Sequence, residues 1–122
     1  MRLWLFIAAV NGFLAVAAGA FAAHALQARL DADSLQLFET GARYHIYHAL
    51  ALGLTALAMR PASAPATLAA ASFLAGIILF CGSLYALSLT GARVLAFITP
   101  VGGLAFLLGW AALAWAAVRT TA

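Results

Sequence analysis

Four long apolar stretches follow one another along the chain. They cover residues 3–23, 41–59, 67–89 and 94–118, and the only charged side chain within them is Arg43. The hydrocarbon core of a bilayer is about 30 Å thick, and about 20 apolar residues in a helix cross it. The pattern predicts an all-α membrane protein, a single transmembrane domain over residues 1–122. Because two connections are short, we expect a four-helix bundle with antiparallel neighbours.

The first connection, residues 24–40, is long and contains every acidic residue of the chain: Asp31, Asp33 and Glu39. Asp33 or Ser34 can cap a new helix, since either side-chain oxygen can accept a hydrogen bond from the first turn. Apolar residues then follow at helical spacing. We therefore expect the second helix to begin outside the membrane, as an interfacial extension, and to run unbroken to about Met59.

Prolines and glycine mark the other connections and the start of the fourth stretch. The sequence RPASAP at residues 60–65 predicts a turn, and Gly91 predicts a tight turn at residues 90–93. Pro100 allows two interpretations. A helix that starts at Val94 is kinked at Pro100, whereas one that starts at Thr99 has Thr99 as its cap and Pro100 at the favoured first position. We favour the kink, because the second alternative leaves irregular backbone in hydrocarbon.

Small residues recur every three or four positions on the first, second and fourth helices. The glycines predicted to form helix-packing contacts are Gly12, Gly19, Gly53, Gly102 and Gly109. Small residues let helix backbones approach closely in lipid, where van der Waals contact drives association. Such stripes can also join copies of the chain, so we predict a homo-oligomer whose contact lies on the fourth helix, at Gly109 and Ala112.

Composition agrees with a membrane protein and excludes several functions. The chain is 67% hydrophobic and 7% charged, and its mean hydropathy is +1.09, far from the values of soluble domains. All six basic residues are arginines that stand singly, so the net positive charge does not predict a nucleic-acid partner. The lone Cys81 lies within the third stretch, where a packing role is expected.

The polar residues of the four stretches gather toward one side of the membrane. With four spans, the end of the first helix, the start of the second, the end of the third and the start of the fourth share one side. The polar residues that we predict to cluster there, as a candidate binding site, are His24, Arg43, Tyr44, His48, Ser83, Tyr85 and Thr99. The opposite half offers little beyond Asn11, Thr55 and Ser72.

Two histidines of this cluster raise the question of a metal. His45 and His48 are three residues apart on one helix face, and His24 or Glu39 could supply a third ligand. A hydrogen-bonded cluster is the favoured alternative, because a third and fourth ligand are not evident. We also find no catalytic triad spacing and no phosphate-binding loop, so the sequence predicts neither a cofactor nor an enzyme.

The arginines bear on orientation. Those on the side of both termini are Arg2, Arg60 and Arg119, and those on the other side are Arg29, Arg43 and Arg93. The count is equal, but Arg43 falls within a predicted helix and the free amino terminus adds charge to the first side. The positive-inside rule therefore favours both termini in the cytoplasm.

Motifs along the chain resemble one known family. They are GAFAAH at residues 19–24, Tyr44-x-x-x-His48 followed by Ala-Leu, GSLY at residues 82–85, and TPVGG with FLLGW within residues 99–110. Together they resemble the uncharacterised small membrane proteins of the YgdD/YwdK type, a family that includes eukaryotic transmembrane protein 256. Ala22 departs from the pattern, which has glycine there.

The resemblance implies a four-span protein of the bacterial inner membrane and no established activity. The residues that it singles out are His24, Tyr44, His48, Ser83, Tyr85, Thr99 and Pro100. Our interpretation is a non-enzymatic integral membrane protein, an accessory or a binder of lipid or of an unidentified small molecule. The alternative is a small transporter or channel that forms by oligomerisation, although no charge lies deep in a span.

Overall fold

The computed structural model describes residues 2–59 and 63–120, and within these ranges every regular element is a helix. The long helices are α1 (Arg2–His24), α2 (Ala32–Ala58), α3 (Ala64–Gly76), α4 (Gly82–Thr90) and α5 (Thr99–Thr120). A π-helical turn, η2 (Ile77–Cys81), joins α3 to α4, and two short 3-10 helices, η1 (Leu26–Ala28) and η3 (Arg93–Phe97), lie in connections. The predicted all-α class is confirmed.

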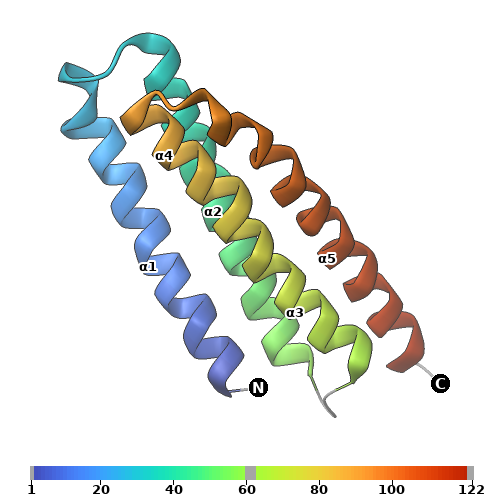
Figure 1. Cartoon of the computed structure of the whole chain (residues 1–122). Helices are drawn as coiled ribbons and strands as arrows, with labels where there is room; N and C mark the ends of the chain where they lie inside the picture. The colour runs from blue at the N-terminus through green and yellow to red at the C-terminus, as the bar shows by residue number, and fades with distance from the viewer. Residues whose placement is uncertain (1, 60–62, 121–122) are drawn as a thin grey trace.

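Four antiparallel rods make up the bundle, because α3, η2 and α4 form one continuous helix (Figure 1). The α2 helix and this long rod lie in the middle, while α1 and α5 flank them (Figure 1). The α1 helix packs mainly on α2, and α5 packs mainly on α3 and η2. Helix α1 begins at the end of the bundle where α5 finishes (Figure 1).

Three segments of the described chain are long and apolar enough to cross a membrane: Arg2–His24, Ala64–Thr90 and Arg93–Arg119. Helix α2 is long enough but carries two acids, an arginine and two histidines within residues 33–48, which lower its hydropathy. It nevertheless packs along α1, since Ala22 and Phe38 belong to one buried cluster near one end and Ala8 lies beside Gly53 toward the other. Because α2 runs beside α1, we keep the prediction of four membrane spans, with α2 as the fourth.

The cap of helix α2 lies two residues before the first of the two predicted caps, Asp33 and Ser34. Asp31 is the cap, and its carboxylate accepts a hydrogen bond from the Ser34 backbone N–H at 2.8 Å. This N–H holds the pKa of the Asp31 carboxyl below its ordinary value. Asp33 instead lies in the first turn, where its charge complements the helix dipole. The helix runs unbroken to Ala58, close to the expected end.

The predicted kink at Pro100 is wrong. Helix α5 begins at Thr99, so Pro100 stands at its start and displaces no hydrogen bond from the helix interior. The backbone before it is not irregular, because residues 93–97 form η3, with bonds from the N–H of Leu95 to Ala92 and from that of Ile98 to Leu95 at 3.0 Å each. These bonds remove the penalty on which the kink prediction rested.

The turn before η3 agrees with the sequence. Gly91 ends α4 with φ of 71°, a left-handed conformation that glycine adopts without strain. At the other short connection, residues 60–62 of the predicted RPASAP turn lie outside the described residues. Ser63 caps α3, accepting from the N–H of Ala66 at 3.3 Å, and Pro65 lies in its first turn.

Glycines line the contact between α5 and the long rod. A Cβ added to Gly109 would stand 2.6 Å from the Phe73 ring, and one added to Gly102 would overlap the backbone of Phe80. Ala112 is also buried in this core. The predicted contact between copies through Gly109 and Ala112 is therefore wrong, because both residues pack inside one chain. A homo-oligomer stays a prediction without an assigned contact.

The other predicted packing glycines lie along α1 and α2 and are looser. A Cβ on Gly53 would meet only the Cβ of Ala8, at 3.8 Å, which is ordinary van der Waals distance. Gly12 and Gly19 have nothing within 4 Å of an added Cβ. Space beside α1 is thus left open, whereas the α5 contact is filled.

We predict that Gly102→Ala destabilises the protein while Gly103→Ala leaves it nearly unchanged. At Gly102 the methyl group meets main-chain atoms that cannot rotate away, whereas at Gly103 the nearest atom belongs to the Phe80 ring at 3.9 Å. Overpacking of this kind costs about 1–3 kcal/mol. Thermal unfolding of both variants in the same detergent measures the difference, and equal melting temperatures would contradict the close contact at Gly102.

Candidate functional site

His45 joins three helices through one imidazole ring. It is buried in α2, its Nε2 lies 3.0 Å from the side-chain oxygen of Asn11 in α1, and its Nδ1 lies 2.9 Å from the hydroxyl of Tyr85 in α4. The Tyr85 ring also packs at 4.7 Å from that of Phe38. Each ring nitrogen of His45 therefore has a partner on a different helix.

The partners determine which nitrogen of His45 carries the proton. The amide nitrogen of Asn11 donates to the carbonyl of Ile7 at 2.8 Å, which turns its oxygen toward His45. An amide oxygen only accepts, so Nε2 of His45 donates, and in the neutral ring Nδ1 accepts from the Tyr85 hydroxyl. The result is a chain of oriented hydrogen bonds across the bundle.

His48, one turn further along α2, has the opposite tautomer. Its Nδ1 lies 2.8 Å from the carbonyl oxygen of Tyr44, so Nδ1 carries the proton. The indole N–H of Trp110 in α5 donates to Nε2 at 3.1 Å. A proton on Nε2 would oppose this donor, so the geometry requires a neutral ring.

Aromatic rings surround His48. Its ring stacks on that of Phe106 with centroids 3.5 Å apart and planes 10° from parallel. Tyr44, Phe73 and Trp110 complete the surroundings, at centroid distances of 6.1, 5.8 and 6.0 Å from His48. Buried in this way, His48 fastens α2 to α5 by both a hydrogen bond and ring packing.

A third polar contact joins α4 to the start of α5. The Ser83 hydroxyl donates to the Phe80 carbonyl at 2.9 Å and shares a hydrogen bond of 2.5 Å with the Thr99 hydroxyl. Thr99 is thus a cross-helix partner, whereas the sequence alternative had it as a cap. The Phe80 carbonyl lies within η2, so the serine also binds to the π-helical turn.

The predicted polar residues do not form one site. Tyr44 lies against His48, Tyr85 pairs with His45, and Ser83 pairs with Thr99. His24 is exposed at the end of α1, and Arg43 is exposed on α2. The predicted cluster of His24 with His48 is wrong in this respect, because the ring nitrogens of His48 are engaged by Tyr44 and Trp110 and not by His24.

The two histidines also do not converge on one point. His45 is directed to α1 and α4, and His48 to α5. Within residues 2–59 and 63–120, no group of three histidine, cysteine or acidic residues is placed to hold a metal ion. A shared metal would require both rings to give up partners that they have.

Sequence reasoning missed two of the partners. Asn11 was assigned to the opposite half, although it lies near the middle of α1 and reaches His45. An amide in an otherwise apolar span is the signal that could have identified it. Trp110 stands in the sequence only within a motif, but its indole N–H can only donate and lies at mid-span, which is the signal for a partner such as His48.

All this polar chemistry is internally satisfied. Among the described residues, no buried side-chain nitrogen or oxygen lacks a hydrogen-bond partner. In hydrocarbon an unpaired polar group costs several kcal/mol, so the pairs stabilise the bundle. The arrangement is that of a structural network between helices.

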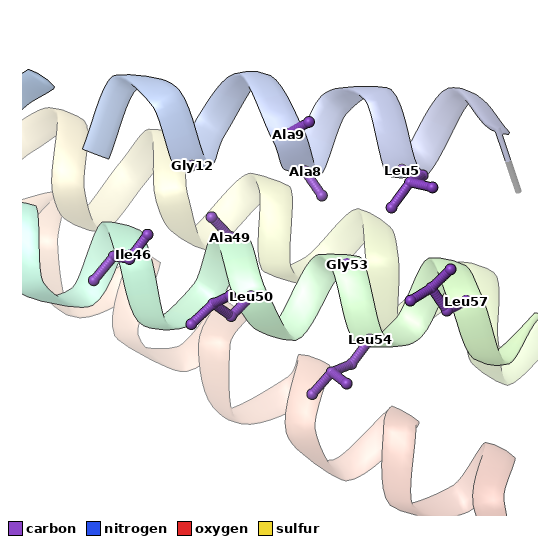
Figure 2. Close-up of a pocket in the computed structure, with 10 residues that line it drawn as sticks. All are labelled: Leu5, Ala8, Ala9, Gly12, Ile46, Ala49, Leu50, Gly53, Leu54 and Leu57. Atoms are coloured by element: carbon purple, nitrogen blue, oxygen red, sulfur yellow. The ribbon is translucent and has the colours of Figure 1, made fainter. Parts of the chain in front are cut away.

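Open space lies elsewhere, on the outside of the bundle. An open cavity of about 510 Å³ runs between α1 and α2, and Figure 2 shows its ten lining residues, all of them apolar. A second cavity of about 280 Å³ continues along the same two helices and includes Glu39 and Arg43. Ile46 lines both. We call the first cavity the α1–α2 groove.

Comparison with known proteins gives a consistent result. The family profile "Protein of unknown function (DUF423)" matches residues 18–103. The chain is 42% identical over 121 residues to the UPF0382 membrane protein YwdK of Bacillus subtilis, covering 98% of each chain. It is 43% identical over 119 residues to the UPF0382 inner membrane protein YgdD of Escherichia coli, covering 97% of this chain and 91% of that one. No solved structure matches.

We predict that Trp110→Phe destabilises the protein, because it keeps a ring beside Phe73 but removes the donor to Nε2 of His48. A buried acceptor left unpaired costs about 1–3 kcal/mol. Trp115→Phe is the control, since Trp115 is exposed and lies under Arg119 at 5.7 Å. Thermal unfolding measures both. Equal stabilities of the two variants would argue against a structural His48–Trp110 bond.

Proposed function

The chain belongs to the DUF423 family of membrane proteins, and we propose that it is a non-enzymatic accessory protein that binds membrane lipid on its outer surface. The observation that carries this proposal is the apolar α1–α2 groove, which opens toward the surroundings of the bundle. In a bilayer those surroundings are acyl chains, so the groove is a receptor for hydrocarbon.

The hydrogen-bonded histidines support a role without catalysis. A general base needs a nitrogen that can receive a proton from a substrate. In His45 and His48 all four ring nitrogens are engaged by groups of the same chain. Substrate chemistry at either ring would first break a bond between helices.

The same network argues against the rival function, an oligomeric transporter or channel. A path for ions or polar solutes needs polar groups directed into a continuous cavity. Here the buried polar groups are directed at one another, and the α1–α2 groove is lined by apolar residues. Ion or solute flux through the purified protein in vesicles would favour the rival.

We further propose a location in a bacterial inner membrane with both termini in the cytoplasm. The Escherichia coli relative is named an inner membrane protein. Arg2 and Arg119 are exposed at the end of the bundle where α1 begins and α5 finishes. Of the arginines toward the other end, Arg43 lies within helix α2, so the positive-inside rule favours this end as the cytoplasmic one.

If the protein binds lipid, it will retain phospholipid through purification. Native mass spectrometry from a mild detergent is expected to show the 12.6 kDa chain with phospholipid bound, and lipid removed by a harsh detergent should return on addition of lipid vesicles. An uncharged sucrose ester serves as a control ligand for nonspecific adhesion. Release of all lipid in every mild detergent would contradict the proposal.

Topology reporters test the orientation. Fusions after Ala122 and within residues 60–65 should both report the cytoplasm, and a fusion within residues 31–34 should report the opposite side, because an even number of spans separates the first two positions. Paired alkaline phosphatase and fluorescent protein fusions provide opposite readouts at each position. Disagreement between the first two positions would exclude four spans.

A further inference from the structure

We propose that the α1–α2 groove holds one acyl chain of an anionic phospholipid from the leaflet beside the start of α1, with Arg2 at its headgroup. This inference rests on the proposed function and names its site and ligand. It follows from the length, lining and charge of the groove.

The groove has the length of one leaflet. Along α2 it extends from Ile46 to Leu57, which is about 16 Å at 1.5 Å per residue. Half of a hydrocarbon core of about 30 Å is about 15 Å. Along α1 it extends from Leu5, one turn from the helix start, to Gly12, near the helix middle. One end therefore faces the membrane surface, and the other lies near the midplane.

The lining suits a flexible hydrocarbon chain. Small residues such as Gly12 and Gly53 face the space between the two helices, and leucines border it (Figure 2). Leu54 and Leu57 are exposed by 61% and 56% and can adjust to an occupant. The ten lining residues offer no side-chain polar atom, so an acyl chain leaves no group of the groove unpaired.

A positive charge stands at the surface end. Arg2 is three residues before Leu5, and Leu5, Ala9 and Gly12 follow one another at helical spacing. Arg2 therefore projects from the groove face of α1, one turn beyond the cavity. Arginine binds phosphate oxygens through paired N–H donors, and each basic group near a membrane surface attracts anionic lipid.

The position of Ile46 favours an acyl chain over a transmembrane helix as the occupant of the groove. This half-buried side chain lines the groove and also the second cavity, which lies in the other half of the bundle. An acyl chain that reaches only to the midplane ends at this junction between the two cavities. A helix from another protein would continue past it, along the rim that bears Glu39 and Arg43.

Two glycines provide a matched pair of variants. Gly12 lines the groove and Gly19 lines the second cavity, and neither has an atom within 4 Å of an added Cβ. Gly12→Leu fills the groove, whereas Gly19→Leu adds the same side chain in the other leaflet. Gly53→Leu fills the groove from α2 and serves as a second variant if Gly12→Leu does not fold.

The experiment is native mass spectrometry of the full chain after exchange into vesicles with equal amounts of phosphatidylglycerol and phosphatidylcholine. We expect wild type and Gly19→Leu to retain one phosphatidylglycerol, and Gly12→Leu to bind it at least about tenfold more weakly, because displaced methylenes lose their burial. Arg2→Gln should lower the preference for phosphatidylglycerol by about fivefold while phosphatidylcholine binds unchanged.

Several outcomes would overturn the proposal, and they are distinguishable. Equal retention of lipid by Gly12→Leu and Gly19→Leu would place the site elsewhere and leave the proposed function intact. No retained lipid on wild type would remove the proposed function as well. An unchanged lipid preference in Arg2→Gln would overturn the headgroup assignment. A dimer of wild type that Gly12→Leu dissociates would identify a second copy as the occupant.

Discussion

The structure depends on the impossibility of leaving a polar group unpaired in hydrocarbon. Water cannot replace a lost partner there, so each buried donor or acceptor must find one inside the chain. His45 meets this constraint by joining Asn11 and Tyr85, and His48 by joining Tyr44 and Trp110. Because the partners come from α1, α4 and α5, these two residues of α2 set how every other rod is rotated against the central helix.

Close packing supplies the rest of the bundle. Lipid tails are as apolar as leucine, so helices gain little by hiding leucines from lipid and gain more by close van der Waals contact. Gly76, Gly102 and Gly109 allow this contact between the long rod and α5, with aromatic rings filling the space. The α1 helix is held differently, mainly by α2 and by the bond from Asn11, and its looser packing leaves the α1–α2 groove open.

The internal hydrogen-bond network and the external α1–α2 groove are separate features of the molecule. The histidines and their polar partners, which the sequence offers as a candidate site, form hydrogen bonds that hold the helices together. The surface available to a partner is apolar and faces the bilayer, with a positive charge at one end. The proposed function uses this surface, through contacts with lipid hydrocarbon and headgroups.

Much of this architecture could be predicted from the sequence. Long uncharged stretches indicate the helices and their order, the predicted caps Asp33 and Ser34 lie within three residues of the observed cap Asp31, and Gly91 marks a turn. The family was also evident from motifs in the right order, and the matches confirm it. These features depend on distance along the chain or on local backbone preference, which a sequence records directly.

Only the tertiary structure decided which face of each helix is inside. In a soluble protein the apolar face is the buried one, but here core and lipid are both apolar, so the pattern of hydrophobic residues does not distinguish them. For that reason Gly109 was predicted to face another copy although it packs on Phe73, and Asn11 was set apart from His45 although they are bonded. The start of α5 at Thr99 likewise depended on a 3-10 segment whose bonds no residue type announces. Rotation about a helix axis is fixed by the partners on neighbouring helices, and these exist only once the bundle has assembled.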